Sequence, residues 1–199
     1  MQPFKITCNQ YNIAYYCTRY QCLNGNSQKL AFRYIGHKGD SCDYSFEDLD
    51  GQSNRYANLL TQLGIKKGDI VFTFLPKMPE QFFAFLGILK TQAVAGTLYS
   101  NFGEEALADR LGDSRAVAVI TKKSLLKKLM RALPQLEHLK YILVVDGTEN
   151  DEKALALPPM LSNASDKFEV SVTGPDAPSV LHYTSGSTGK PKGVQHVHK

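Results

Sequence analysis

Short, continuous apolar runs alternate with helical patterns through the middle of this sequence. The apolar runs are Ile70–Leu75, Val94–Leu98, Ala116–Thr121 and Tyr141–Val145, and the helical patterns between them are Pro79–Lys90, Glu104–Leu111 and Leu125–Leu133. A strand that is apolar throughout is buried on both faces, as in a parallel sheet that helices cover. Alternation at this spacing indicates βαβ crossovers. We therefore expect an α/β fold with a doubly wound, mostly parallel sheet.

The residues before this alternating region predict smaller elements. The first 25 residues are polar and aromatic and could form a helix that lies on the domain. Leu30–Ile35 and Cys42–Tyr44 have the pattern of two short strands around a turn. Ser45 and Asp48 form a capping pattern for a following helix, and Gly64 is placed to end that helix in the left-handed conformation.

The segment from residue 146 to residue 178 interrupts the alternation. It holds four of the nine prolines, together with many Asn, Asp, Ser and Gly residues. This composition is typical of a surface connection, and we expect at most a short helix near Pro158–Ser162. The segment is interpreted as the exit from a first domain, so that residues 1–175 form one unit and residues 176–199 begin another.

Composition and charge exclude several classes of protein. Of the 199 residues, 43% are hydrophobic and 21% are charged, which is ordinary for a globular chain and excludes a low-complexity or disordered one. The net charge of +4 is weaker than is usual for a nucleic-acid binder. The longest apolar run, Phe82–Leu89, is too short to cross a membrane, and the first residues lack the apolar core of a signal peptide. These features predict a cytoplasmic protein with neither a nucleic acid nor a membrane as partner.

The cysteines and one basic helix face each allow two interpretations. The four cysteines, at positions 8, 17, 22 and 42, have no C-x-x-C spacing, so we favour free thiols and expect no metal site. In the helix Leu125–Leu133 the basic residues Lys127, Lys128 and Arg131 lie opposite the leucines. A solvated face is the favoured explanation, and contact with a phosphate-bearing ligand, a nucleic acid or an anionic membrane surface is the alternative.

The segment from Thr184 to Gly193 differs from everything before it. It lies between two short strand patterns, 180–183 and 194–198, and contains four hydroxyl side chains, three glycines, Lys190 and Lys192. Glycines let the backbone amides approach an anion, and hydroxyls and lysines donate hydrogen bonds to phosphate oxygens. The common P-loop is excluded, because Thr184 replaces its first glycine and Pro191 replaces its Mg²⁺-binding hydroxyl residue. A flexible Gly/Ser linker would explain neither the lysines nor the flanking strands.

Residues 183–194, YTSGSTGKPKGV, resemble the signature loop of the adenylate-forming enzymes, a family that includes acyl-CoA synthetases, luciferases and peptide-synthetase adenylation domains. Segments 44–49, 54–57, 64–71 and 75–80 are similar to N-terminal blocks of the same family, so that the resemblance covers nearly the whole chain. Residues 11–14, 105–111, 181–183 and 193–198 look most like the acetyl-CoA synthetases within it. The resemblance implies that residues 1–175 are the N-terminal α/β subdomain of an AMP-binding domain, and that residues 176–199 begin the next subdomain.

The resemblance also implies a reaction and a set of ligands. A carboxylate would attack the α-phosphate of ATP to give an acyl-adenylate and pyrophosphate, and the thiol of coenzyme A would then displace AMP. The substrates would be acetate, ATP and coenzyme A, with Mg²⁺ as cofactor. The loop would clamp the β- and γ-phosphates, through Thr184, Ser185, Gly186, Ser187, Thr188, Gly189, Lys190 and Lys192. The turn 100–103 corresponds to a region of the family that comes near coenzyme A.

The family's catalytic lysine, its ribose-binding aspartate and most of its carboxylate pocket would lie beyond residue 199. We therefore expect an N-terminal fragment that has no catalytic residue of its own and makes no acyl-adenylate alone. Its hairpin at residues 180–198 should be displaced, mobile or packed on a neighbouring molecule. The alternatives are a propionate or medium-chain enzyme, a domain that loads a carrier protein, and a non-catalytic nucleotide-binding module. Oligomeric state stays open. His196 and His198 would share one face of a strand, where packing or hydrogen bonding is favoured over metal binding.

Overall fold

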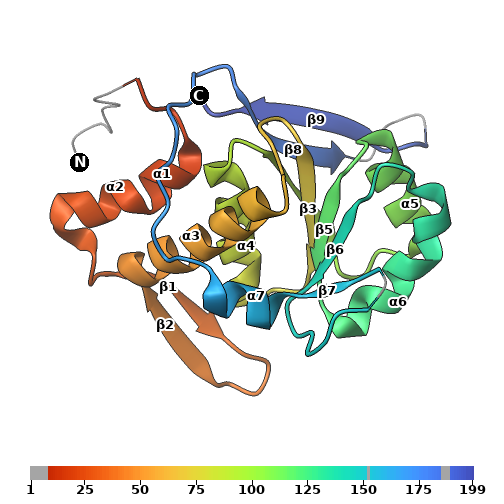
Figure 1. The fold of residues 1–199 in the computed structure, drawn as a ribbon, viewed down its shortest axis with the longest axis horizontal. Coiled ribbons are helices and arrows are strands. Elements are labelled where there is room, and N and C mark those ends of the chain that lie inside the picture. The colour runs from red at the N-terminus through yellow and green to blue at the C-terminus, as the bar shows by residue number, and fades with distance from the viewer. Residues whose placement is uncertain (1–8, 152, 185–188) are drawn as a thin grey trace.

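The computed structural model describes residues 9–151, 153–184 and 189–199, and its centre is a seven-stranded sheet (Figure 1). The strands lie in the order β7-β6-β5-β3-β4-β8-β9, and only the pairing of β9 with β8 is antiparallel. Their bounds are β3 Ile70–Leu75, β4 Val94–Tyr99, β5 Ala118–Thr121, β6 Tyr141–Val144, β7 Leu155–Ala156, β8 Pro178–Thr184 and β9 Lys192–Val197. A separate antiparallel hairpin is formed by β1 (Leu30–Ile35) and β2 (Ser41–Ser45).

Helices cover both faces of this sheet, which confirms the predicted α/β, doubly wound and mostly parallel architecture. Figure 1 shows α3 and α4 on one side of the strands and α5 and α6 on the other. The helices are α1 Ile13–Cys17, α2 Arg19–Gln21, α3 Phe46–Gln62, α4 Pro79–Lys90, α5 Glu104–Asp113, α6 Lys123–Ala132 and α7 Leu157–Asn163, with a π-helical turn at Cys22–Asn26 and a 3₁₀ turn at Leu133–Gln135.

Strand β3 shows why an uninterrupted apolar run was needed at the centre. Val71 and Leu75 pack into the core beneath α3 and α4, whereas Phe72 and Phe74 pack into the core beneath α5 and α6. Successive side chains of a strand point to opposite faces, so a strand covered on both sides is apolar at nearly every position. The exception in β3 is the buried Thr73, whose hydroxyl donates a hydrogen bond to Gly96 O at 3.3 Å. The Phe72 ring occupies the space of a missing side chain on the neighbouring strand, because a Cβ on Gly96 would lie 2.1 Å from it.

Local signals place most helix ends. The Ser45–Asp48 capping box is present, with the Asp48 amide donating to Ser45 Oγ at 3.1 Å and the Ser45 amide donating to Asp48 Oδ2 at 2.9 Å. Gly64 adopts a φ of 79°, as expected for the residue after α3. Helix α5 differs from its prediction, because it continues through Gly112 and the left-handed conformation falls on Arg115, with a φ of 53°.

The connection after α7 is held against the body by side-chain amides. Gln10 Nε2 donates to the carbonyls of Val170 (3.2 Å) and Ser171 (3.1 Å), and Gln92 Nε2 donates to those of Ser171 and Val172, both at 3.2 Å. These contacts hold the connection in place where it passes the N-terminal segment on its way to the edge of the sheet beside β4. No helix in the described part of the chain is long and apolar enough to span a membrane.

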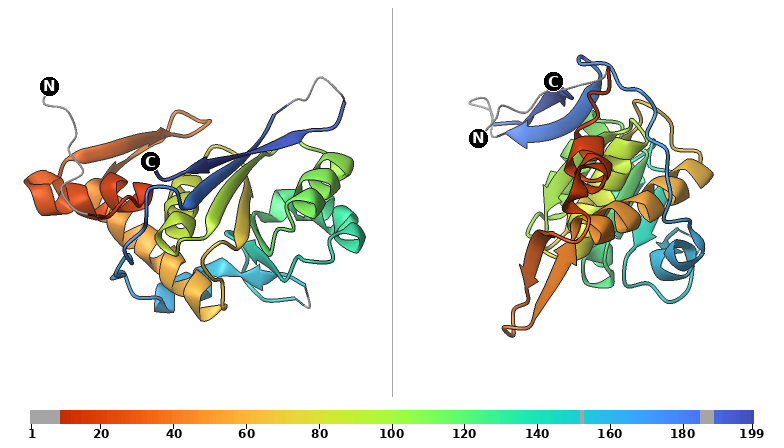
Figure 2. Two further views of the ribbon diagram at one scale, coloured as in Figure 1. Left: turned by 90° about the horizontal axis from the view of Figure 1, so that it is seen from above. Right: turned by 90° about the vertical axis from the view of Figure 1, so that its left-hand side faces the viewer.

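The C-terminal hairpin corrects one expectation. We expected the hairpin to be displaced, but β8 joins the main sheet by pairing Ala95 with Val180 and Gly96 with Leu181. Ser179, Val180 and Leu181 are buried within their own chain, since β4 offers them both a hydrogen-bonding edge and the two cores. Strand β9 is exposed at all six positions and forms the outer edge (Figure 2).

Candidate functional site

The phosphate-binding segment predicted from the sequence begins at the carboxyl end of β8. Since β8 runs parallel to β4, the last residues of the two strands, Thr184 and Tyr99, lie at the same edge of the sheet. In open α/β sheets ligands bind outside the carboxyl ends of the strands. The position of the segment therefore agrees with the function that its composition predicts.

The structure describes four of the eight predicted loop residues. Thr184 and Lys192 are cross-strand partners in the β8–β9 hairpin, and both are exposed. Gly189 has a φ of 90°, and no atom of the described residues beyond its two chain neighbours lies within 4 Å of where a Cβ would stand. Lys190 beside it is exposed. Ser185, Gly186, Ser187 and Thr188 lie outside the described residues. The described members thus gather one hydroxyl, one left-handed glycine and two lysines at one end of the hairpin.

A hollow of about 180 Å³ lies beside the loop at this edge of the sheet. It is lined by Thr97, Tyr99, Phe102, Arg110, His182 and Tyr183. The guanidinium of Arg110 lies over the Phe102 ring, 4.4 Å from the ring centroid. The turn after β4 is held from behind, since Lys128 Nζ donates to Ser100 O at 3.0 Å. Lys128 therefore contacts the turn that, by the resemblance, corresponds to a region near coenzyme A. It does not belong to a fully solvated helix face.

Tyr183 links the hairpin to helix α5. Its hydroxyl donates a hydrogen bond to Asp113 Oδ2 at 2.5 Å. Burial, and next the hydrogen bond to Asp113, raises the pKa of the Tyr183 phenol well above its usual value, so the phenol remains a donor at neutral pH. Tyr183 and Asp113 are not linked by any local sequence pattern. The available signal was the spacing of Arg110 and Asp113, three positions apart on one helix, which puts them on a shared face.

The two histidines predicted to share a face have different surroundings. His196 lies in β9, with its ring 5.7 Å from that of His182 on the neighbouring strand. His198 follows the strand and is buried, and its Nδ1 accepts a hydrogen bond from the Ile13 amide at 3.1 Å. Within residues 9–151, 153–184 and 189–199, no group of three or more His, Cys, Asp or Glu side chains could hold a metal ion.

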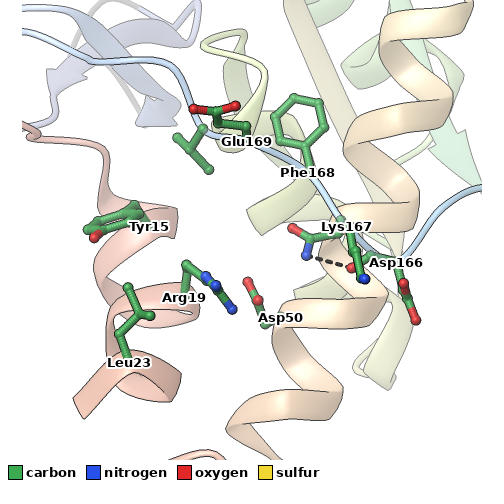
Figure 3. Close-up of a pocket in the computed structure, with 10 residues that line it drawn as sticks. Tyr15, Arg19, Leu23, Asp50, Asp166, Lys167, Phe168 and Glu169 are labelled. Carbon is green, nitrogen blue, oxygen red and sulfur yellow. Dashed lines mark hydrogen bonds between the residues drawn. The ribbon is translucent and has the colours of Figure 1, made fainter.

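A larger hollow, about 650 Å³ in volume, lies away from the hairpin, between α1, α2, α3 and residues 166–170. Figure 3 shows the Arg19 guanidinium pointing toward Asp50 on its floor. Asp50 is held from beneath by Lys90, whose Nζ donates to Asp50 Oδ1 at 2.7 Å and to Asn54 Oδ1 at 2.6 Å. Burial lowers the pKa of Lys90, and the charge of Asp50 opposes that shift. This cluster joins α3 to α4.

One known protein family matches most of this chain. The model of the AMP-binding enzymes matches residues 20–199, which include the hairpin and both core layers. The chain belongs to the AMP-binding enzyme family.

Individual members of this family share much of the sequence. The chain is 36% identical over 190 residues to an acetyl-coenzyme A synthetase of Bacillus subtilis, a match that covers 94% of this chain and 33% of the relative. Acetyl-coenzyme A synthetases of Helicobacter acinonychis (32% identical, 93% and 30% covered) and Streptomyces coelicolor (30% identical, 94% and 31% covered) are also similar. The chain spans about a third of the length of these curated relatives.

Solved structures of AMP-binding enzymes share the fold. A Brucella canis acyl-CoA synthetase superposes with a TM-score of 0.83 at 26% identity, over 94% of this chain and 33% of that one. An anthranilate CoA ligase in complex with anthranoyl-AMP gives a TM-score of 0.84 at 24% identity, over 96% and 35% of the two chains. The doubly wound sheet is therefore an architecture found in acyl-CoA ligases.

Proposed function

We propose that the protein carrying this chain activates acetate with ATP and transfers the acetyl group to coenzyme A. A carboxylate oxygen of acetate attacks the α-phosphate of ATP, forming acetyl-adenylate and releasing pyrophosphate. The thiol of coenzyme A then loses its proton and attacks the acyl carbon, giving acetyl-CoA and AMP. The similarity to acetyl-coenzyme A synthetases at 30–36% identity supports acetate as the carboxylate.

One observation carries the proposal, namely the grouping of Thr184, Lys190 and Lys192 at the hairpin end on the carboxyl edge of the sheet. In the proposed reaction these side chains hold the β- and γ-phosphates together with Gly189, Ser185, Gly186, Ser187 and Thr188. Negative charge grows on the pyrophosphate as it departs, and donors that already point there stabilise the transition state. Each hydrogen bond to such a charged group contributes about 1.5–3 kcal/mol.

The proposed Mg²⁺ has no protein ligand set among the described residues. The hairpin offers ammonium and hydroxyl groups, which suit an anion, whereas Mg²⁺ is bound by oxygen ligands and often by substrate phosphates. We therefore expect phosphate oxygens of ATP to be ligands of the Mg²⁺ ion.

We also propose a subdomain boundary near residue 175, with residues 1–175 as the N-terminal α/β subdomain and residues 176–199 as the start of the next. The narrow junction supports this boundary. Strand β8 pairs with β4 at two positions, whereas β3 pairs with β4 at six, from Ile70–Val94 to Leu75–Tyr99. A segment that shares few backbone hydrogen bonds with its neighbour can belong to a separate folding unit.

The direct test uses the complete polypeptide in which this sequence occurs. We expect acetate-dependent exchange of pyrophosphate into ATP, and release of AMP once coenzyme A is added. Lys190→Ala and Lys192→Ala should each lower the exchange rate about tenfold or more, as expected for loss of one charged hydrogen bond. Lys127→Ala, at an exposed position on α6, is the matched control and should leave the rate unchanged. A complete polypeptide without carboxylate-dependent exchange would contradict the proposal.

The same assay separates the alternatives. Faster exchange with propionate or hexanoate would indicate a different acyl specificity, and acyl transfer to a phosphopantetheinyl carrier protein in place of coenzyme A would indicate a carrier-loading domain. The 199-residue chain alone should give no exchange, and detectable exchange would overturn that prediction. Calorimetric titration of the same chain with Mg-ATP addresses a non-catalytic nucleotide-binding module, which requires measurable affinity. We expect weak binding or none.

A further inference from the structure

The entrance to the phosphate-binding loop has little main-chain support on the side of the sheet. Among the described residues, β8 pairs with β4 only at Val180 and Leu181. The remaining residues up to Thr184 pair with β9, which is itself exposed along its whole length. Backbone hydrogen bonds to the body therefore stop two residues before Tyr183, and something else must fix the strand end from which the loop begins.

Helix α5 provides that contact through Asp113. Asp113 Oδ2 accepts the hydrogen bond from the Tyr183 hydroxyl at 2.5 Å, between residues 70 positions apart in the sequence. Asp113 is the last residue of α5, and this helix is anchored in the core through Leu107 and Leu111. A hydrogen bond to a carboxylate is among the stronger polar contacts in proteins. The Tyr183 side chain thus joins the hairpin to a rigid element.

Arg110 braces the same contact from the side. Its guanidinium lies 4.4 Å from the Phe102 ring centroid and 6.0 Å from that of Tyr183, while its Nη1 donates to Ala106 O at 2.9 Å within α5. The Tyr183 ring also lies 6.4 Å from the Phe72 ring of β3. A cation over an aromatic face is attracted to it, so Arg110 restricts how far the tyrosine ring can move.

We infer that Asp113 and Arg110 are positioning residues for the phosphate-binding loop, and that they act through Tyr183. This inference rests on the proposed function. Tyr183 directly precedes Thr184, the first residue of the loop. A shift of the Tyr183 side chain therefore moves the start of the loop. Because a misplacement of about 1 Å can slow a reaction by about 100-fold, a contact remote from the phosphates can control how ATP is held.

The test compares Tyr183→Phe and Asp113→Asn in the complete polypeptide, each of which weakens the hydrogen bond without a change of size. Asp109→Asn, at an exposed position on the same helix, and Tyr34→Phe, at a half-buried position on β1, are the matched controls. In acetate-dependent ATP–pyrophosphate exchange, KM for ATP should rise about tenfold in both variants. Thioester formation from acetyl-adenylate supplied ready-made should keep its rate, because that step needs no bound pyrophosphate. The double variant should resemble either single one.

The results of this test separate a failure of the proposed function from a failure of the positioning role. If the unsubstituted polypeptide shows no carboxylate-dependent exchange, the proposed function fails and this inference fails with it. If that exchange is present but both variants keep the original KM for ATP, the function stands and the positioning role is overturned. An equal loss in both half-reactions, or loss of the folded circular dichroism spectrum in both variants, would show a general structural contact and would also overturn it.

Discussion

Lys90 donates a 2.7 Å hydrogen bond from Nζ to Oδ1 of Asp50, with its own side chain fully buried and that of Asp50 only 11% exposed. The pair connects the C-terminal turn of α4 to the middle of α3. Asn54 Oδ1 accepts a second bond from the same ammonium, and Asn54 Nδ2 donates to Asp166 O at 2.8 Å. The ion pair therefore belongs to a network that ties two helices to the segment after α7.

Removal of one partner of this pair should destabilise the protein strongly. Lys90→Met keeps the volume of the side chain but leaves the Asp50 carboxylate buried without its cation, which costs about 3–5 kcal/mol. Urea unfolding followed by circular dichroism measures this loss, and Lys127→Met at the surface of α6 is the control, with an expected change within about 0.5 kcal/mol. The double variant Lys90→Met/Asp50→Leu should recover part of the stability. A loss below about 1 kcal/mol in Lys90→Met would contradict the importance of the pair.

Helices α3 and α4 also make a close approach that glycine permits. A Cβ on Gly87 would lie 2.5 Å from the Cβ of Tyr56 and 2.9 Å from Ser53 O, on the facing helix. Gly87→Ala should therefore destabilise the protein by about 1–3 kcal/mol, although alanine favours the helix intrinsically. Gly112→Ala is the matched case within α5, where the nearest atom, Gln135 O, would lie 4.0 Å away. This variant should gain about 0.5–1 kcal/mol. Equal effects at the two sites in urea unfolding would refute the packing argument.

The central strands could be predicted from the sequence because burial on both faces makes each of them a continuous apolar run. Ile70–Leu75 and Pro79–Lys90 begin and end where the pattern predicts. The two-residue strand β7 was missed, since Leu155–Ala156 is too short to show a period. The placement of β8 beside β4 was also missed. Which edge a strand joins depends on pairing between residues about 85 positions apart, and local periodicity carries no information about that.

The same limit applies to the candidate site. Thr184, Lys190 and Lys192 were predicted because glycines, hydroxyls and lysines concentrated in one short segment suit a phosphate ligand. The contact of Tyr183 with Asp113 was not predicted, because the two residues come together only when β8 and α5 pack on the same sheet. Arg115 illustrates a competition between signals, since the helical pattern ended at Leu111 but α5 continues to Asp113 and an arginine takes the left-handed conformation.

His198 should make stability depend on pH. Burial lowers the pKa of His198 below its ordinary value of 6.5, and its Nδ1 accepts from the Ile13 amide at the start of α1. As pH falls below about 6.5, the unfolded chain binds the proton before the folded protein does, so the free energy of unfolding decreases until the folded pKa is reached. His198→Asn should reduce this dependence below pH 6.5 in urea unfolding, whereas His138→Asn, at an exposed position, should retain it. Identical pH dependence in both variants would exclude His198 as its source.

Substitution by glycine should change the stability of the protein in opposite directions at two non-glycine residues that have left-handed backbones. Gln92 has a φ of 63° and Arg115 a φ of 53°, and this conformation costs a residue with a Cβ about 1–2 kcal/mol. Arg115 is exposed, so Arg115→Gly should gain up to about 1 kcal/mol after the greater entropy of glycine in the unfolded chain is subtracted. Gln92→Gly obtains the same relief but loses the two hydrogen bonds to Ser171 O and Val172 O, and should lose about 1 kcal/mol net. Urea unfolding of both variants measures the difference. A gain in Gln92→Gly equal to that in Arg115→Gly would show that the amide contacts with residues 171 and 172 add nothing to the stability of the fold.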